Sequence, residues 1–187
     1  MKEKFNYRLM LLSNSIACLA FNLIGPFFVL FINKLGGSLE NLGLLFGMSI
    51  LANSIASYFI GKYSDRFGRK PFLLLSSFLS SVIIVLYIYI TNLPQLYALQ
   101  IANGINTAMW MTSERIFMAD ITKKETRGKS IGFYDMILGI LAAIGVMSGG
   151  FVIGKFGFEI IFWFVGIISF ISSIILIFIK EKKLNKT

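Results

Sequence analysis

Long apolar stretches with few or no charged residues constrain this chain more than any other feature. The chain has 187 residues, of which 56% are hydrophobic and 14% charged. A helix needs roughly 20 apolar residues to cross a bilayer core about 30 Å thick. Six stretches reach that length, so we predict six transmembrane helices, at about 9–32, 42–60, 72–90, 95–118, 130–154 and 158–179.

These six helices account for almost the whole chain. We therefore predict an all-α membrane protein in which residues 1–187 form a single six-helix bundle without an aqueous domain. The first stretch is too long for a signal-peptide core and lacks a small-x-small cleavage site, so we expect it to remain as a helix. With one cysteine, Cys18, and no histidine, the chain has no disulfide framework and no ligand set for zinc or copper. We expect no cofactor and no enzyme activity.

The positive charge of the chain is distributed unevenly. Lysine and arginine number 18 against nine acidic residues, which would suggest nucleic-acid binding in a soluble protein. If both termini are cytoplasmic, however, every cation except Lys34 and Lys155 falls in a cytoplasmic segment, including the basic tail 180–186. The positive-inside rule therefore predicts a multi-pass protein of the cell membrane with both termini cytoplasmic. We attribute the excess charge to orientation and lipid headgroups, and expect no nucleic-acid partner.

A charged ten-residue turn, 61–70, separates the second and third apolar stretches. Its two glycines permit sharp backbone bends, and its four cations hold it at the cytoplasmic surface. The pattern Gly-x-x-x-Asp-Arg-x-Gly-Arg-Lys resembles the signature loop between helices two and three of the major facilitator superfamily. The matching residues are Gly61, Asp65, Arg66, Gly68, Arg69 and Lys70.

This resemblance implies a fold and a gate. The fold is the N-terminal half of such a transporter, with six helices arranged as two inverted three-helix repeats. In the family the loop latches the inner gate, so Asp65, Arg66 and Arg69 are expected to contact helix ends and Asp120. The charged turn after Asp120 closes on Arg127, as in the family. We therefore predict that Asp120 and Arg127 are inner-gate partners and that Arg69 interacts with Asp120.

Two positions depart from the family pattern. Gln100 stands four residues before Gly104, where many members carry an arginine, so this site has no fixed positive charge. Val146 replaces the proline expected in the glycine-rich motif 145–150 of antiporter members. The second motif therefore does not by itself indicate export.

Polar residues recur at three- and four-residue steps along the fourth stretch and so share one helix face. Because polar groups are unfavourable in lipid, this face should meet protein or a watery cavity. Two interpretations remain open: the face lines a solute path, or its amides bond to neighbouring helices. We predict a cavity between helices one, two, four and five, with the candidate lining residues Asn22, Asn53, Gln100, Asn103, Asn106, Thr107, Trp110, Glu114 and Asp135.

The remaining stretches give simpler predictions. Pro26 should kink the first helix, the serines of the third should mediate helix packing, and the sixth, rich in isoleucine and phenylalanine, should face lipid. Asp135 should face protein near Glu114 or Arg115. Asp135 also lies on a small-residue face of the fifth helix that should let another helix approach closely; that face consists of Gly132, Asp135, Gly139, Ala143, Val146 and Gly150.

Two function classes follow from these features. The first is a secondary transporter of a small uncharged or amphipathic solute. Six helices offer only half of a cleft, so this transporter would need a second copy or a separately encoded C-terminal half and would not work as a monomer. The second is a non-transporting truncated remnant or a regulatory membrane subunit.

Overall fold

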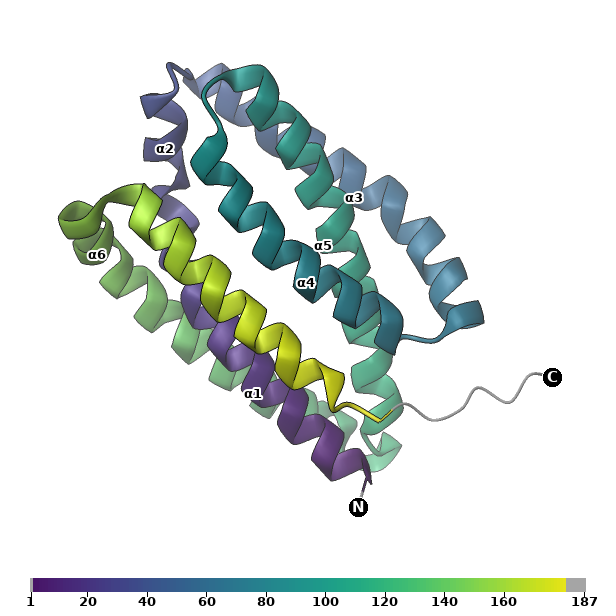
Figure 1. Cartoon of the computed structure of the whole chain (residues 1–187). Coiled ribbons are helices and arrows are strands. Elements are labelled where there is room, and N and C mark those ends of the chain that lie inside the picture. The colour runs from purple at the N-terminus through teal and green to yellow at the C-terminus, as the bar shows by residue number, and fades with distance from the viewer. Residues whose placement is uncertain (1, 181–187) are drawn as a thin grey trace.

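The computed structural model describes residues 2–180, and nearly all of them are helical (Figure 1). The basic tail beyond Lys180 lies outside the described residues. The structure consists of α1 (Lys2–Asn22), α2 (Phe28–Lys34), α3 (Leu39–Phe67), α4 (Lys70–Leu86), α5 (Leu93–Ile121) and α6 (Arg127–Ile177), with 3-10 turns η1 (Gly25–Phe27), η2 (Tyr87–Tyr89) and η3 (Lys124–Thr126).

The first apolar stretch bends at the predicted kink. Helix α1 ends at Asn22, and η1 precedes the start of α2 at Phe28. Pro26 has no N–H to donate, and its ring would clash with the carbonyl four residues earlier, so a straight helix cannot continue through it. Helices α1 and α2 are thus the two parts of one bent segment.

Helix α6 contains both the fifth and the sixth predicted stretches. It is interrupted at Gly157, whose φ of 77° and ψ of 173° are not helical and strongly favour glycine. In Figure 1 the chain turns back near this point, from a green first arm to a yellow second arm. We refer to residues 127–156 and 158–177 as the first and second arms of α6.

Four segments have the length and hydropathy of a membrane span: Lys2–Lys34, Leu39–Phe67, Lys70–Tyr89 and Lys124–Ile177. The last has 54 residues and includes the break at Gly157. Helix α5 is not among these four segments. Its 29 residues are enough to cross a membrane, but the polar residues on one of its faces lower its mean hydropathy. Six crossings in two repeats therefore stay a prediction.

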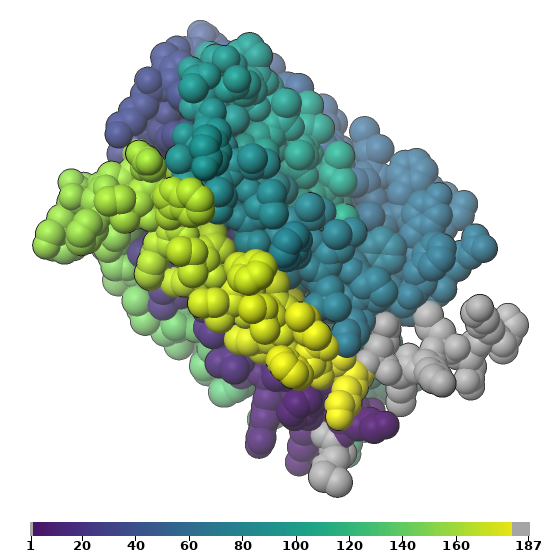
Figure 2. Space-filling view, in the orientation of Figure 1, coloured from purple at the N-terminus to yellow at the C-terminus, as the bar shows by residue number. Residues whose placement is uncertain are grey.

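Helix packing follows a simple pattern. Helix α3 packs mainly on α5, α1 packs on α6, and α4 lies between α5 and α6. Figure 2 shows α4 in teal beside the second arm of α6 in yellow, with α3 in blue projecting at one side. One apolar cluster surrounds Ile32, Leu96 and Phe162, and a second surrounds Met10 and Leu176.

Glycine permits the two closest helix contacts, although not where we predicted them. A Cβ on Gly104 would lie 2.3 Å from the Ser49 carbonyl oxygen of α3, and one on Gly149 would lie 2.3 Å from the Leu23 carbonyl oxygen beyond α1. By contrast, a Cβ on Gly132 or Gly139 would have no neighbour within 4 Å. Within this chain the small-residue face is therefore packed only in part, at Gly150, where a Cβ would lie 3.0 Å from the Phe27 ring, and the approach of another helix to the rest of the face stays a prediction.

The sixth stretch has an exposed apolar face that includes Ile167, Phe170 and Ile171, so its predicted contact with lipid stays a prediction, but it also packs within the bundle. The second arm of α6 buries one face against α1 and α4. The hydroxyls of Ser172 and Ser13 lie 2.7 Å apart, and those of Ser173 and Ser77 lie 2.8 Å apart. Ser172 and Ser173 thus bond to neighbouring helices, while isoleucine and phenylalanine dominate the composition of this arm. For Ser77, the predicted role in helix packing is confirmed.

Candidate functional site

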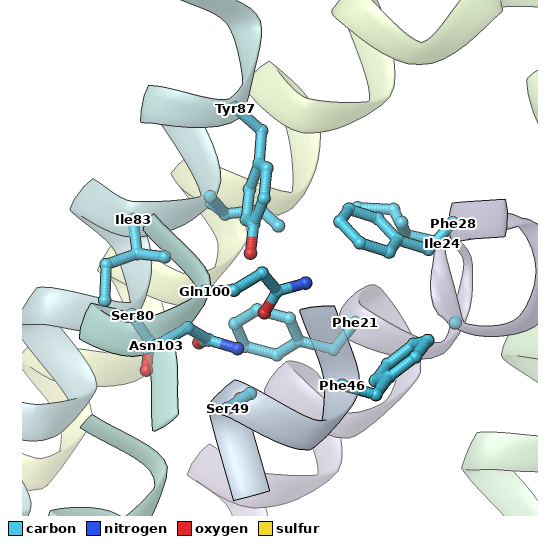
Figure 3. A pocket seen from close by; sticks show the side chains of 12 residues that line it. Phe21, Ile24, Phe28, Phe46, Ser49, Ser80, Ile83, Tyr87, Gln100 and Asn103 are labelled. Carbon is cyan, nitrogen blue, oxygen red and sulfur yellow. The ribbon is translucent and has the colours of Figure 1, made fainter. Parts of the chain in front are cut away.

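A cavity of about 230 Å³, here called the Gln100 cavity, lies between α1, α3, α4 and α5. Figure 3 shows the Gln100 and Asn103 amides of α5 among the rings of Phe21, Phe46 and Tyr87. Aromatic walls with a few amides can orient a small solute through hydrogen bonds. The lining residues are Phe21, Ile24, Gly25, Phe28, Phe46, Ser49, Ser80, Ile83, Ile84, Tyr87, Gln100 and Asn103.

A second cavity of about 270 Å³, here called the Glu114 cavity, lies between α1, α4, α5 and α6. Phe21 and Ser80 line both cavities, so the two are adjacent. Serines of α4 and of the second arm of α6 give this cavity a hydroxyl-rich wall. The lining residues are Asn14, Ala17, Cys18, Phe21, Ser77, Ser80, Trp110, Glu114, Leu138, Ser169 and Ser172.

Glu114 is held by neutral donors from two other helices. Asn14 of α1 donates from Nδ2 to Glu114 Oε1 over 2.5 Å, and also to the Tyr134 hydroxyl. Tyr134, on the first arm of α6, donates its hydroxyl to the same Glu114 oxygen over 2.5 Å. Hydrogen bonds to a carboxylate are stronger than neutral ones. We call Asn14, Glu114 and Tyr134 the Glu114 network, and it connects α1, α5 and α6.

Some residues on the polar face of α5 line cavities, and another bonds to a neighbouring helix. Gln100 and Asn103 line the first cavity, and Trp110 and Glu114 line the second. Asn106 instead donates from Nδ2 to Ser80 Oγ over 2.8 Å, as the helix-packing interpretation expects. This face therefore both lines cavities and bonds to a neighbouring helix.

Other predicted cavity residues lie elsewhere. Asn53 and Thr107 are half-buried and line neither of the two cavities. Asn22 donates from Nδ2 to the Cys18 carbonyl oxygen over 2.8 Å, which is a bond within its own helix. These three positions thus contribute to the helix surfaces around the cavities.

Asp135, another predicted cavity residue, lines neither of the two cavities. Asp135 is exposed on the first arm of α6, whereas its neighbour Tyr134 is 4% exposed and reaches Glu114. Successive residues on a helix point about 100° apart, so the two side chains cannot both face the network. The pattern of polar residues did not single out Asn14 or Tyr134. Tyr134 lies within a predicted transmembrane stretch, and a buried tyrosine hydroxyl needs a hydrogen-bond partner. This was the sequence signal that could have identified Tyr134.

The signature loop forms a contact at the opposite end of the bundle from η1. Arg69 Nη2 lies 3.1 Å from Asp65 Oδ1, and Arg69 Nε lies 3.5 Å from Asp120 Oδ2. Gly68 ends α3 with a φ of 92°, which gives the sharp bend expected of this loop. The predicted interaction of Arg69 with Asp120 is thus present, and we call Asp65, Arg69 and Asp120 the loop latch.

Three other charged residues near the loop have different contacts. Arg66 is exposed, with its guanidinium 5.5 Å from the Phe67 ring centroid. Lys70 donates from Nζ to the Ile177 carbonyl oxygen over 2.8 Å and so connects the loop to the end of α6. Arg127 donates from Nη2 to the Ala119 carbonyl oxygen over 2.7 Å. Arg127 therefore satisfies the C-terminal end of α5.

The sequence of the chain matches a known family and several curated proteins. Residues 10–187 match the Major Facilitator Superfamily. "Uncharacterized MFS-type transporter YitZ" of Bacillus subtilis is 31% identical over 157 residues, which cover 84% of this chain and 96% of that protein. "Multidrug resistance protein 2" of Bacillus subtilis is 30% identical over 190 residues, which cover 99% of this chain and 47% of that protein.

A third relative, "Multi-drug resistance efflux pump PmrA" of Streptococcus pneumoniae, is 26% identical over 185 residues, which cover 95% of this chain and 46% of that protein. The chain thus spans nearly all of the first relative and about half of the other two. The signature loop, the apolar helices and the match over residues 10–187 lead to one conclusion: the chain is an integral membrane protein that belongs to the Major Facilitator Superfamily.

Proposed function

We propose that this chain is one half of a secondary transporter that moves a small solute across the cell membrane. The Glu114 cavity carries the proposal, because a half-buried carboxyl group within an apolar helical bundle is costly and therefore rare unless it has a function. The Gln100 cavity adjoins it and adds amides and aromatic rings. Members of this family are transporters, and two of the relatives are named for multidrug resistance.

The solute of this transporter is uncharged or amphipathic. Among the described residues that line the two cavities, Glu114 is the one acidic residue, and no lysine or arginine lines them. Gln100 occupies the position at which many family members carry arginine, so a fixed cation to attract an anionic solute is lacking there. The aromatic walls around Gln100 and Trp110 suit the apolar part of such a solute.

The transporter has six crossings in two inverted repeats, and both termini are cytoplasmic. A second six-helix unit, either another copy or a separately encoded half, completes the path. Exposure of Asp135 beside Gly139 and Ala143 on α6 supports this proposal. A carboxylate facing lipid costs about 2–3 kcal/mol at depth, so a covering protein surface stabilises this face.

The loop latch controls the inner gate in this proposal. Arg69 connects the end of α3 with Asp120 near the end of α5, so opening the path between these helix ends would break the ion pair. The role of Arg127 is to hold the end of α5 in place for that contact. Alternating access then depends on a contact that forms in one state and is lost in the other.

Transport in vesicles tests the proposal. The purified chain is reconstituted, and uptake of a panel of radiolabelled uncharged and amphipathic solutes is compared with that of Glu114→Gln. We expect the substitution to reduce uptake roughly tenfold or more, which corresponds to about 1.4 kcal/mol of lost interaction. Glu125→Gln is the matched control, because Glu125 is exposed in η3 and lines neither cavity. Equal uptake by both variants would exclude the Glu114 cavity from the solute path.

Crosslinking tests the assembly. Single cysteines replace Gly139 or Ala143 after Cys18 is replaced by alanine, and membranes are treated with an oxidant. We expect a dimer at these positions, because both are exposed on the face that contains Asp135. Phe170→Cys, exposed on the second arm of α6, is the control and should stay monomeric. Monomer at every position, without a copurified partner and without transport, would instead favour a non-transporting remnant or regulatory subunit.

A further inference from the structure

A third pocket, of about 390 Å³, lies where the start of α1 meets the link between α5 and α6. Lys4 and Arg8 of α1 and Lys123 of the link border it, and all three are exposed. Within residues 2–180, none of the three forms an ion pair. Glu3 is the one carboxylate among the described lining residues, so cations outnumber it three to one. We call this space the Lys4 pocket.

The start of α6 adds to the positive potential of the Lys4 pocket. Thr126 and Ser130 border the pocket, and no side chain caps the first turn of this helix. The N-terminus of a helix carries a partial positive charge and free N–H groups, both of which favour an anion. Tyr7 donates its hydroxyl to the Ser130 carbonyl oxygen over 2.8 Å and so fixes α1 against this turn.

The same pocket has an apolar side. Leu11 is half-buried, and Phe133 is 49% exposed, so both leave apolar surface next to the cations. A site for a soluble anion would not need this surface. Cations beside an exposed aromatic ring at a membrane boundary instead match the junction of a lipid headgroup with its acyl chains.

We propose that the Lys4 pocket binds an anionic phospholipid of the inner leaflet. Its phosphate lies among Lys4, Arg8 and Lys123, and its acyl chains pass along Leu11 and Phe133. The proposal rests on the orientation given above, with both termini cytoplasmic, but does not depend on transport. A lipid bound there would hold the start of α1 against α6, two helices that the Glu114 network also connects.

Native mass spectrometry of the full chain in detergent tests the proposal, with phosphatidylglycerol as probe and phosphatidylcholine as neutral comparison. We expect one retained phosphatidylglycerol molecule and a preference for it over phosphatidylcholine. The triple variant Lys4→Gln, Arg8→Gln and Lys123→Gln should reduce this preference by roughly tenfold or more. The matched control is Lys62→Gln, Arg115→Gln and Lys129→Gln, which removes the same charge from exposed positions that do not line the pocket. Equal losses in the two triple variants would overturn the site in favour of general charge attraction.

Two further measurements test whether the ligand is a lipid or a soluble phosphate, and whether its acyl chains contact Phe133. An excess of glycerol 3-phosphate should leave the lipid bound, whereas complete displacement would identify a soluble phosphate site and overturn the proposal. Phe133→Ser should weaken phosphatidylglycerol binding without changing the charge, and unaltered binding would contradict the acyl-chain contact. Thermal unfolding checks that every variant is folded. Because none of these measurements uses a transported solute, failure of the lipid site and failure of the transport proposal are separate results.

Discussion

The Glu114 network and the loop latch hold carboxylates in opposite ways. Glu114 is half-buried and accepts hydrogen bonds from the neutral groups of Asn14 and Tyr134. In the latch, Asp65 and Asp120 have side chains 69% and 56% exposed, and Arg69 supplies a full positive charge. A half-buried carboxylate that loses a donor keeps part of its desolvation cost, whereas an exposed one is solvated by water. The network should therefore stabilise the fold, and the latch should remain easy to break.

The largest effect on stability is expected from Tyr134→Phe. This change removes one donor to Glu114 and leaves the ring in place, so it should lower the free energy of unfolding by on the order of 1–2 kcal/mol. Thermal unfolding of the purified protein measures the change. Tyr58→Phe is the control, because Tyr58 is 73% exposed. Equal midpoints for the two variants would show that the network does not stabilise the bundle.

A smaller effect is expected from Ser173→Ala. The Ser173 hydroxyl lies 2.8 Å from that of Ser77, and both groups are buried and neutral. Hydrogen bonds of this kind between membrane helices contribute about 0.6 kcal/mol on average. The same unfolding assay, with Ser148→Ala as a control whose hydroxyl bonds within its own helix, would sharpen the comparison. A loss larger than that of Tyr134→Phe would contradict the special role of the carboxylate.

The smallest effect on stability is expected at the latch. Arg69→Gln or Asp120→Asn should change the unfolding free energy by roughly a few tenths of a kcal/mol, and high salt should reduce the difference further. Both variants should nevertheless increase the reactivity of a cysteine placed at Asn103 toward a membrane-impermeant reagent from the cytoplasmic side. A double variant that exchanges the charges of Arg69 and Asp120 should bring this reactivity partly back to the original value. Unchanged reactivity in all three variants would remove the latch from the gate.

Local sequence rules predicted the features that depend on a single segment of the chain, such as bends and turns. Pro26 bends the first segment because a proline ring cannot fit a continuous helix. Gly68 turns the loop because its φ of 92° suits glycine. The contact of Arg69 with Asp120 came from a family pattern, and the structure contains it. Periodicity also identified Gln100 and Glu114 as residues on one polar face.

The tertiary structure decided what each face meets. Tyr134 and Asp135 are adjacent in sequence, yet one bonds to Glu114 and the other is exposed, because α1 packs on only one side of α6. Asn14 and Ser172 lie in apolar helices, and their hydrogen-bond partners lie on other helices. A helical period determines which side chains share a face, but the partner of that face depends on contacts between segments far apart in sequence. The sequence by itself therefore determined the apolar segments, the bends and the loop, and only helix packing decided the partners of Glu114 and the walls of its cavity.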